Sequence, residues 1–268
     1  MRKTVFALVK YKPNEIIDFF LNGRIVYESH EIHQIIENDG IAWDILKIVE
    51  YSKNSEYDDD LRDFNEAKDN LEKYKVILLN RFSYLRDKSE RMRIKFKNLI
   101  LSDNTAISLD KTIRETPKQK RKRIEGNRPN INSFNILREK SKVPRPIYFV
   151  NLVKYRDVAI YPPGYKGKQI SGKKASYIYT RIAYKYNAKH GNLFVYLSDA
   201  IKTLADNTET KTTWEMIIIV KYKSFASIVD FNAEPMFQLA HIHKDAGIDH
   251  TYVYATFSSN KNAELHDY

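Results

Sequence analysis

The feature that most constrains the fold of this sequence is a stretch that occurs twice. Residues 42–51 and 213–222 each contain a tryptophan followed by an acidic residue, continue through isoleucine and valine, and end at tyrosine. Runs rich in these branched residues are typical of strands. Within residues 214–222, the even-numbered side chains are predicted to share one face, with Ile217 and Ile219 on the other. A strand that is apolar on both faces must be covered on both sides.

Elements in the same order surround each copy of this stretch. The first unit is predicted as strand 4–11, a short helix 14–22, strand 25–32, strand 43–51, helix 55–74 and strand 76–82. The second is predicted as strand 148–155, helix 171–190, strand 194–198, strand 214–222, a helix that starts at 224 and restarts after 235, and strand 251–257. Four matched segments in one order predict an internal duplication of a β-α-β-β-α-β unit.

The net charge of +11 belongs to the segment that joins the two units. Residues 86–146 hold 18 Lys/Arg and 7 Asp/Glu, which is also +11, so the rest of the chain is neutral. Alternating basic and apolar residues at 91–97 could add one strand. The basic run at 118–123 could contact phosphates, but it lacks the aromatic residues that stack on bases, which favours a solvated linker.

The composition and the hydropathy pattern exclude several classes of site and of protein. The sequence has no cysteine, which excludes disulfides, thiolate metal sites and cysteine nucleophiles. Its first residues run directly into a strand pattern, so we expect a cytoplasmic protein. No apolar run approaches the roughly 20 residues needed to span a bilayer.

The second unit carries a set of residues that together resemble a known family. They are Phe149-Val150-Asn151-Leu152, Gly172 with Ala175, Tyr177 and Tyr179, then Gly191, Trp214-Glu215, Tyr222-Lys223-Ser224 and the segment 243–251. With these residues it resembles the ferredoxin-like, dimeric α/β-barrel superfamily, and most closely its small domains of unknown function. The resemblance covers about residues 147–257, and the first unit is a degenerate copy. Lys244 replaces the family's usual arginine and Gly247 its second alanine.

In that superfamily two sheets pack face to face across a dimer, with helices outside. The resemblance therefore implies an α+β fold of two tandem ferredoxin-like βαββαβ units, whose antiparallel sheets pack as an intramolecular pseudo-dimeric barrel. The boundaries that we predict are a first unit at 1–86, a basic, partly mobile linker at 87–146, a second unit at 147–260 and a C-terminal tail at 261–268. Members include cofactor-free oxygenases, isomerases and haem proteins, so the fold does not settle the function.

His243 is the candidate catalytic residue. On the helix after Pro235, its spacing from Leu239 and Ala240 directs it towards the sheet, where superfamily members hold ligands. Such a histidine can move protons or ligate a metal, and it can also be a hydrogen-bonded residue of a packed helix end. His241, in contrast, points away and is expected at the surface, as is His250.

Five residues are candidates for ligand binding. They are Asn151, Tyr155, Tyr179, Trp214 and Lys244. The Asn151 amide either orients a ligand carbonyl or satisfies a neighbouring backbone group. Tyr155 and Tyr179 either offer hydroxyls to the pocket or pack in the core, and Trp214 and Trp43 fit the core or the contact between the sheets.

We expect no metal and no cofactor. His30 and His33 would lie on opposite faces of a regular strand, so a shared metal would need a bulge. Two hypotheses of function follow. The first is a protein that binds a small apolar or aromatic molecule in its second unit, as an oxygenase or isomerase would. The second is a scaffold whose basic linker engages an acidic partner or nucleic acid. Of these partners we expect the small ligand or self-association through sheet or helix faces, rather than nucleic acid or a membrane.

Overall fold

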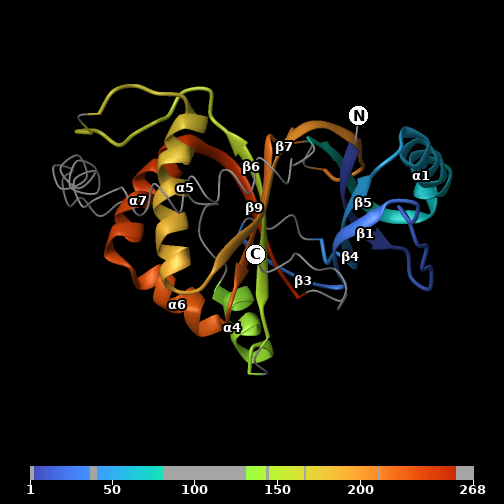
Figure 1. Ribbon diagram of the computed structural model, residues 1–268, viewed down its shortest axis with the longest axis horizontal. Coiled ribbons are helices and arrows are strands. Elements are labelled where there is room, and N and C mark those ends of the chain that lie inside the picture. Colours follow the sequence, from blue (N-terminus) through green and yellow to red (C-terminus); the bar gives the residue numbers. More distant parts are fainter. Residues whose placement is uncertain are drawn as a thin grey trace.

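A computed structural model of the protein describes residues 3–36, 41–80, 131–142, 145–165, 167–209 and 212–257 (Figure 1). The elements of the first unit are β1 (Lys3–Tyr11), β2 (Arg24–Ser29), β3 (Glu31–Ile36), β4 (Ile45–Tyr51), α1 (Asn54–Ala67), a 3-10 turn (Lys68–Asn70) and β5 (Leu71–Leu79). Helix α4 (Ile131–Lys140) lies in the segment that we assigned to the linker. The elements of the second unit are β6 (Ile147–Tyr155), α5 (Gly172–Lys189), β7 (Leu193–Asp206), β8 (Met216–Tyr222), α6 (Phe225–Ala233), α7 (Pro235–Gly247) and β9 (Ile248–Phe257).

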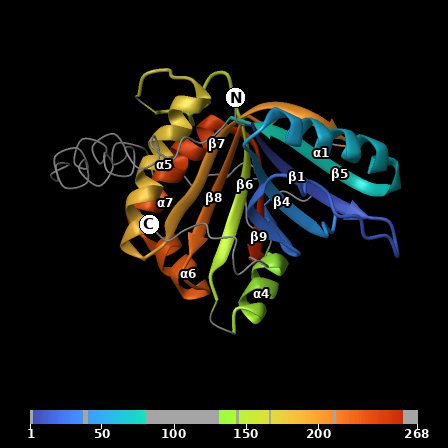
Figure 2. The ribbon, with the colours of Figure 1, turned by 45° about the vertical axis from the view of Figure 1, so that its right-hand side comes forward.

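The described strands form one antiparallel sheet of nine strands in the order β2-β4-β1-β5-β7-β8-β6-β9-β3. Its two outermost strands, β2 and β3, are separated in the chain by His30 alone. The chain therefore joins the two edges of the sheet at this residue. The helices lie outside the curled sheet (Figure 2). The predicted single strand 25–32 is instead two strands with a bend at His30, because β2 and β3 pair in different halves of the sheet.

The two units are joined by equivalent strand pairings. The first half of β7 pairs with β8 of its own unit, and its second half pairs with β5 of the other unit. In the same way β2 pairs with β4 of its own unit, whereas β3 pairs with β9 of the other. A buried hydrogen bond of 2.5 Å between the Tyr27 and Thr256 hydroxyls also joins the units. The predicted pseudo-dimeric barrel within one chain is confirmed.

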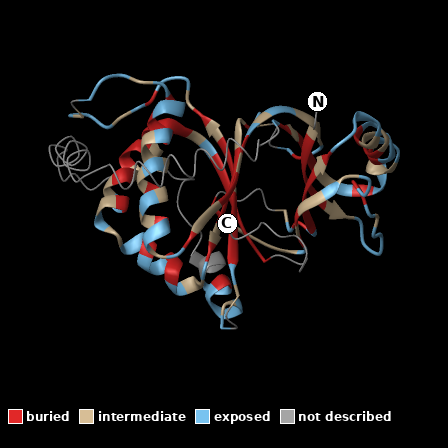
Figure 3. Ribbon diagram, in the orientation of Figure 1, coloured by how far each residue is buried: buried red, intermediate tan, exposed pale blue. Residues whose placement is uncertain are grey.

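The core has three layers, and the buried strands separate them (Figure 3). Between the two halves of the sheet lies a cluster with side chains from both units, including Phe6, Tyr27 and Ile217. A second cluster lies under α5, α6 and α7, and a third under α1. Burying each of these large side chains contributes roughly 1.5–3 kcal/mol relative to leaving it exposed. The predicted cover on both faces of the sheet is thus confirmed.

The repeated tryptophan–acid pair has a structural explanation. Each unit's first strand has a register shift at its last residue, Tyr11 or Tyr155, where a backbone N–H leaves the ladder. The Asp44 carboxylate accepts the N–H of Tyr11 at 2.9 Å, and the Glu215 carboxylate accepts that of Tyr155 at 2.8 Å. The acids therefore complete the hydrogen bonding of the sheet at two equivalent places.

Trp214 is not on the face that the alternation predicted. Its indole lies between the two halves of the sheet with Ile217 and Ile219, not with the even-numbered residues under the helices. The reason is that regular strand β8 begins only at Met216, so the alternation does not extend back to the tryptophan. Trp43 occupies the same cluster, which confirms that both tryptophans pack between the sheets.

The short helix predicted at 14–22 does not form. These residues are irregular, with positive φ values at Asn14 (67°) and Phe20 (55°). The Phe19 carbonyl accepts a hydrogen bond from the buried Lys47 ammonium at 3.2 Å instead of one from a helix turn. Phe19 and Phe20 pack on Phe64 of α1, with ring centroids 5.7 and 5.5 Å away, so they fill the place of the absent helix.

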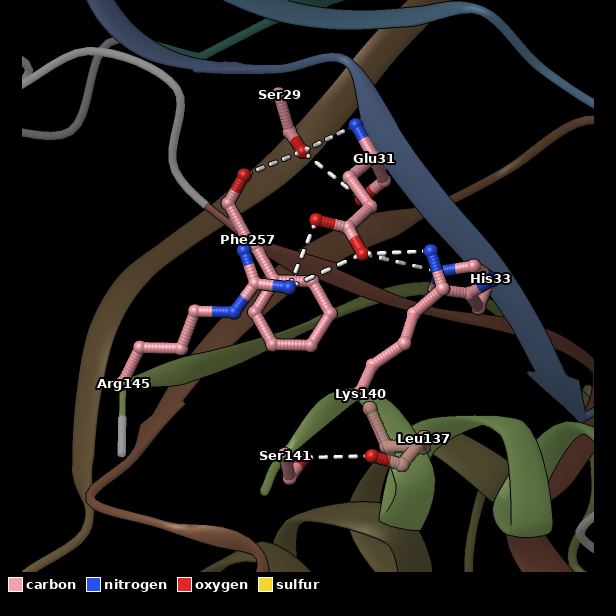
Figure 4. A network of polar contacts seen from close by, with 8 residues as sticks. All are labelled: Ser29, Glu31, His33, Leu137, Lys140, Ser141, Arg145 and Phe257. Atoms are coloured by element: carbon pink, nitrogen blue, oxygen red, sulfur yellow. Dashed lines mark hydrogen bonds and ion pairs between the residues drawn. The ribbon is translucent and has the colours of Figure 1, made fainter. Parts of the chain in front are cut away.

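Helix α4 is held against β3 and β9 by a small polar network (Figure 4). Glu31 accepts hydrogen bonds from Lys140 at 2.8 Å and from Arg145 at 2.9 and 3.1 Å. The Arg145 guanidinium also lies over the Phe257 ring at 3.6 Å. Burial raises the pKa of Glu31, but the hydrogen bonds from the two cations outweigh it and lower the pKa overall. The predicted strand at 91–97 and the basic run at 118–123 lie outside the described residues.

Candidate functional site

The loop between β6 and α5 folds over the C-terminal end of α7. The N–H of Arg156 donates to the carbonyl of Gly247, and the N–H of Ile160 donates to that of Ala246, both at 2.9 Å. The backbones of α5 and α7 meet so closely that a Cβ on Gly247 would lie 2.4 Å from the Gly172 carbonyl oxygen. Glycine is therefore required at position 247.

His243 lies under this loop. Its side chain is buried, and its Nδ1 shares a hydrogen bond of 2.8 Å with the Tyr161 hydroxyl. The rings of Tyr161 and Tyr165 are stacked, with centroids 3.9 Å apart and planes 9° apart. Both tyrosine rings are nearly perpendicular to the imidazole ring, and their centroids lie 5.6 and 6.3 Å from the imidazole centroid. The result is a histidine enclosed by two tyrosines.

Burial keeps the Tyr161 phenol of this pair protonated. Burial, followed by the neighbouring Tyr165, raises the pKa of the Tyr161 phenol well above its usual value. The phenol therefore keeps its proton at neutral pH, and its hydroxyl can both donate and accept. A neutral phenol bonded to an imidazole can hold and pass on a proton, which is the chemistry of general acid–base catalysis.

The sequence signal for the two tyrosines is a turn in the segment between the predicted strand 148–155 and the predicted helix 171–190. Tyr161 and Tyr165 flank Pro162-Pro163-Gly164. The N–H of Tyr165 donates to the Pro162 carbonyl at 3.2 Å, and Gly164 has a φ of 85°. Proline followed by a glycine with positive φ is the pattern of a type II turn. Such a turn brings the residues on its two sides together, and here it stacks their rings.

Two of the candidate ligand-binding residues, Asn151 and Tyr155, bond to groups of the sheet. The Asn151 amide donates to the carbonyls of Phe149 and Ile218 at 3.0 and 3.1 Å, so it satisfies backbone groups of the sheet. The Tyr155 hydroxyl lies 3.0 Å from the Met216 sulfur, and burial raises the pKa of that phenol.

Two further candidates lie at the contact between α5 and α7. Tyr179 packs on Phe237 and His241, with ring centroids 5.6 and 5.5 Å away, and the Lys244 ammonium lies 6.0 Å from the Tyr179 ring. His241, which was predicted to lie at the surface, is half-buried, and its ring is also 4.6 Å from that of Phe237 on the same helix. The cause is α5, which covers the side of α7 that a lone helix would expose.

One buried charge was not singled out from the sequence. Lys75 of β5 is fully buried between the two halves of the sheet. Its ammonium lies 3.7 Å from the Asp206 carboxylate, and 5.5 and 5.2 Å from the centroids of the Trp214 and Tyr252 rings. Opposite charge and aromatic faces both lower the cost of burying this cation.

Three other histidines of the described residues, His30, His33 and His250, lie in strands or directly beside them. His30 is exposed and lies 2.7 Å from Glu28, and His250 is exposed beside Asp249. His33 lies in β3, where burial, followed by the charge of Lys140, lowers the pKa of its imidazole. Within the described ranges, no group of three or more histidine, aspartate or glutamate side chains is placed to hold a metal ion. None of the helices described is long and apolar enough to cross a membrane.

Several solved structures are similar to this chain. A protein of unknown function from Rhodopseudomonas palustris is 23% identical over 47% of this chain and 92% of its own, with a TM-score of 0.41. A candidate monooxygenase from Lactobacillus acidophilus NCFM is 9% identical over 97% of this chain and 94% of its own, with a TM-score of 0.42. An anthrone oxidase-like protein is 8% identical over 97% of this chain and 92% of its own, with a TM-score of 0.38.

The described part of the chain is an α+β barrel built on one antiparallel sheet of nine strands. Searches against protein-family models and against curated proteins gave no match. The function therefore has to be argued from the residues of the site.

Proposed function

We propose that this α/β barrel binds a small aromatic or apolar molecule beside the Tyr161–His243 pair and moves a proton on it, as a cofactor-free oxygenase or isomerase does. The observation that carries the proposal is the 2.8 Å hydrogen bond between the Tyr161 hydroxyl and the buried imidazole. The imidazole can accept a proton from a bound ligand, and the Tyr161 hydroxyl holds the ring in place. The stacked ring of Tyr165 supports an aromatic ligand.

The test uses anthrone, a flat aromatic ketone with an acidic CH₂ group, and 1-naphthol as a ligand that does not turn over. Oxidation of anthrone consumes one O₂ and gives anthraquinone and one water. We expect saturable binding of 1-naphthol and O₂ uptake with anthrone. His243→Gln should retain the circular dichroism spectrum and lose O₂ uptake, while Tyr165→Ala should weaken 1-naphthol binding. A wild-type rate equal to that of buffer, with no saturable binding, would contradict the proposal.

A second candidate is a scaffold without catalysis. In its favour, the space between the sheets is filled by side chains of both units, and the Asn151 amide is engaged by two carbonyls. In that case 1-naphthol does not bind and anthrone gives no O₂ uptake above that of buffer. The function then lies on outer surfaces or in the basic linker. Binding of an acidic partner that is lost at high salt and after neutralisation of residues 118–123 would support this candidate.

We also infer that the two units descend from one ancestral βαββαβ unit. Support comes from the equivalent pairings of β7 and of β2 with β3, and from Asp44 and Glu215, which accept equivalent backbone N–H groups. Unrelated strands share valine and isoleucine, but they have no reason to share a register shift with an acid that completes it.

A further inference from the structure

The outer face of α5 is basic. The helix contains five Lys/Arg residues and no Asp or Glu. Lys173 and Lys189 form ion pairs with Asp199 and Glu234 of the same unit, at 3.0 and 2.6 Å. The three others, Lys174, Arg181 and Lys185, are exposed, and we call them the basic row. Among the described residues, no ion pair involves any of the three.

Spacing places the basic row on one face of the helix. Its members are seven and four residues apart, which is close to two turns and one turn of an α-helix. The row is therefore about 16 Å long, at 1.5 Å per residue. One large aromatic side chain, Tyr177 (64% exposed), lies along the same stretch of α5.

Helix α1 has the opposite composition. It contains six Asp/Glu residues and one Arg, which is −5, against +5 for α5. Asp60 is buried, where it accepts hydrogen bonds from Asn22 and Tyr51. The outer side carries Asp59, Asp63 and Glu66, which we call the acidic row. Arg62 pairs with two members of the row, at 3.0 and 3.6 Å.

The two rows are far apart within one molecule. Helix α1 covers one unit and α5 the other, on opposite sides of the barrel in both views (Figures 1 and 2). Within one chain they cannot meet, whereas two copies can bring them together. The acidic row spans about 10 Å, so it fits within the length of the basic row.

We propose that the basic row of one copy docks on the acidic row of a second copy of this chain. The two surfaces differ, so the contact is head-to-tail and each copy keeps one row for a further neighbour. Exposed ion pairs are individually weak and are screened by salt, so the association is reversible and salt-dependent. This inference does not depend on the proposed ligand site.

A nucleic acid fits α5 less well than a second copy does. Single-stranded nucleic acid is bound by basic grooves in which successive bases stack on aromatic side chains. The described face of α5 offers only Tyr177 as a strongly exposed ring. The acidic row, in contrast, supplies on the same chain a helix of equal and opposite charge.

The test is sedimentation velocity of the full chain at high protein concentration, in about 20 mM and about 500 mM salt. Neutralisation of the basic row (Lys174→Gln, Arg181→Gln, Lys185→Gln) or of the acidic row (Asp59→Asn, Asp63→Asn, Glu66→Gln) should give monomers. A mixture of these two variants should give a one-to-one dimer, because each retains the row that the other lacks. The matched control, with exposed Lys168, Lys202 and Lys223 changed to Gln, should associate like the wild type.

Three results would overturn the proposal. The first is a wild type that stays monomeric at low salt, and the second is a mixture of the two variants that forms no dimer. The third is an unchanged association of the basic-row variant together with a loss of its binding to oligo-dT, which would assign α5 to nucleic acid instead.

Discussion

The contact between α5 and α7 gives the sharpest prediction for a single substitution. In an open helix, Gly247→Ala would stabilise the protein by up to about 1 kcal/mol, because alanine restricts the unfolded backbone more than glycine does. Here the new Cβ would lie 2.4 Å from the Gly172 carbonyl oxygen and 2.9 Å from the Ala175 Cβ. Both neighbours belong to α5 and cannot rotate away, so the helices must separate.

Overpacking of this kind costs typically 1–3 kcal/mol, which exceeds the gain from helix propensity. We therefore expect Gly247→Ala to lower the free energy of unfolding by about 1–2 kcal/mol, measured by urea denaturation. Lys185→Ala, an exposed change in the same pair of helices, should stay within about 0.5 kcal/mol of the wild type. A Gly247→Ala protein as stable as the wild type would refute the close approach of the two backbones.

Three further predictions concern single polar groups. Tyr161→Phe leaves a buried imidazole nitrogen without its hydroxyl partner, so urea denaturation should show a loss of about 1–3 kcal/mol. Asp44→Ala and Glu215→Ala each remove the acceptor of a backbone N–H, and both should lower the free energy of unfolding to a similar extent; an effect in one alone would contradict their equivalence. The pH dependence of the free energy of unfolding should show separate contributions from Glu31 and His33. The folded state lowers the pKa of both, so stability is lost as pH falls. Glu31→Gln should remove the part of this loss below about pH 4.5, and His33→Gln the part that begins near pH 6.5.

The sequence was most informative where one local pattern determines the structure. The strand alternation correctly predicted that Ile217 and Ile219 face one side and Ile218 the other. Ser171 and Ser224 were sound predictions of helix starts, since each side chain accepts an N–H of the first turn. These hydrogen bonds join residues only three positions apart, so they can be predicted from the sequence of the segment itself.

The errors arose where a distant residue determines the structure. The apolar residues at 14–22 suit a helix, but the Lys47 ammonium of β4 donates to the Phe19 carbonyl and holds that segment as a packed, irregular chain. His241 was predicted to be exposed, but Tyr179 of α5, which is distant in sequence, packs against it. The partner of His243 was missed because Tyr161 lies 82 residues away, in a loop whose turn positions it. Periodicity along one element cannot reveal these contacts.

The central claim is that β5 of the first unit pairs with β7 of the second within one chain. Leu78 and Lys202 face each other in that pairing, and the chain has no cysteine of its own. Directly opposed residues of antiparallel strands have Cβ atoms about 4.5–5.5 Å apart, so cysteines at both positions are close enough to be oxidised together. In a dilute sample of Leu78→Cys with Lys202→Cys, diamide should give an intramolecular disulfide in most chains. Free thiols, or disulfides found only between chains, would contradict the barrel.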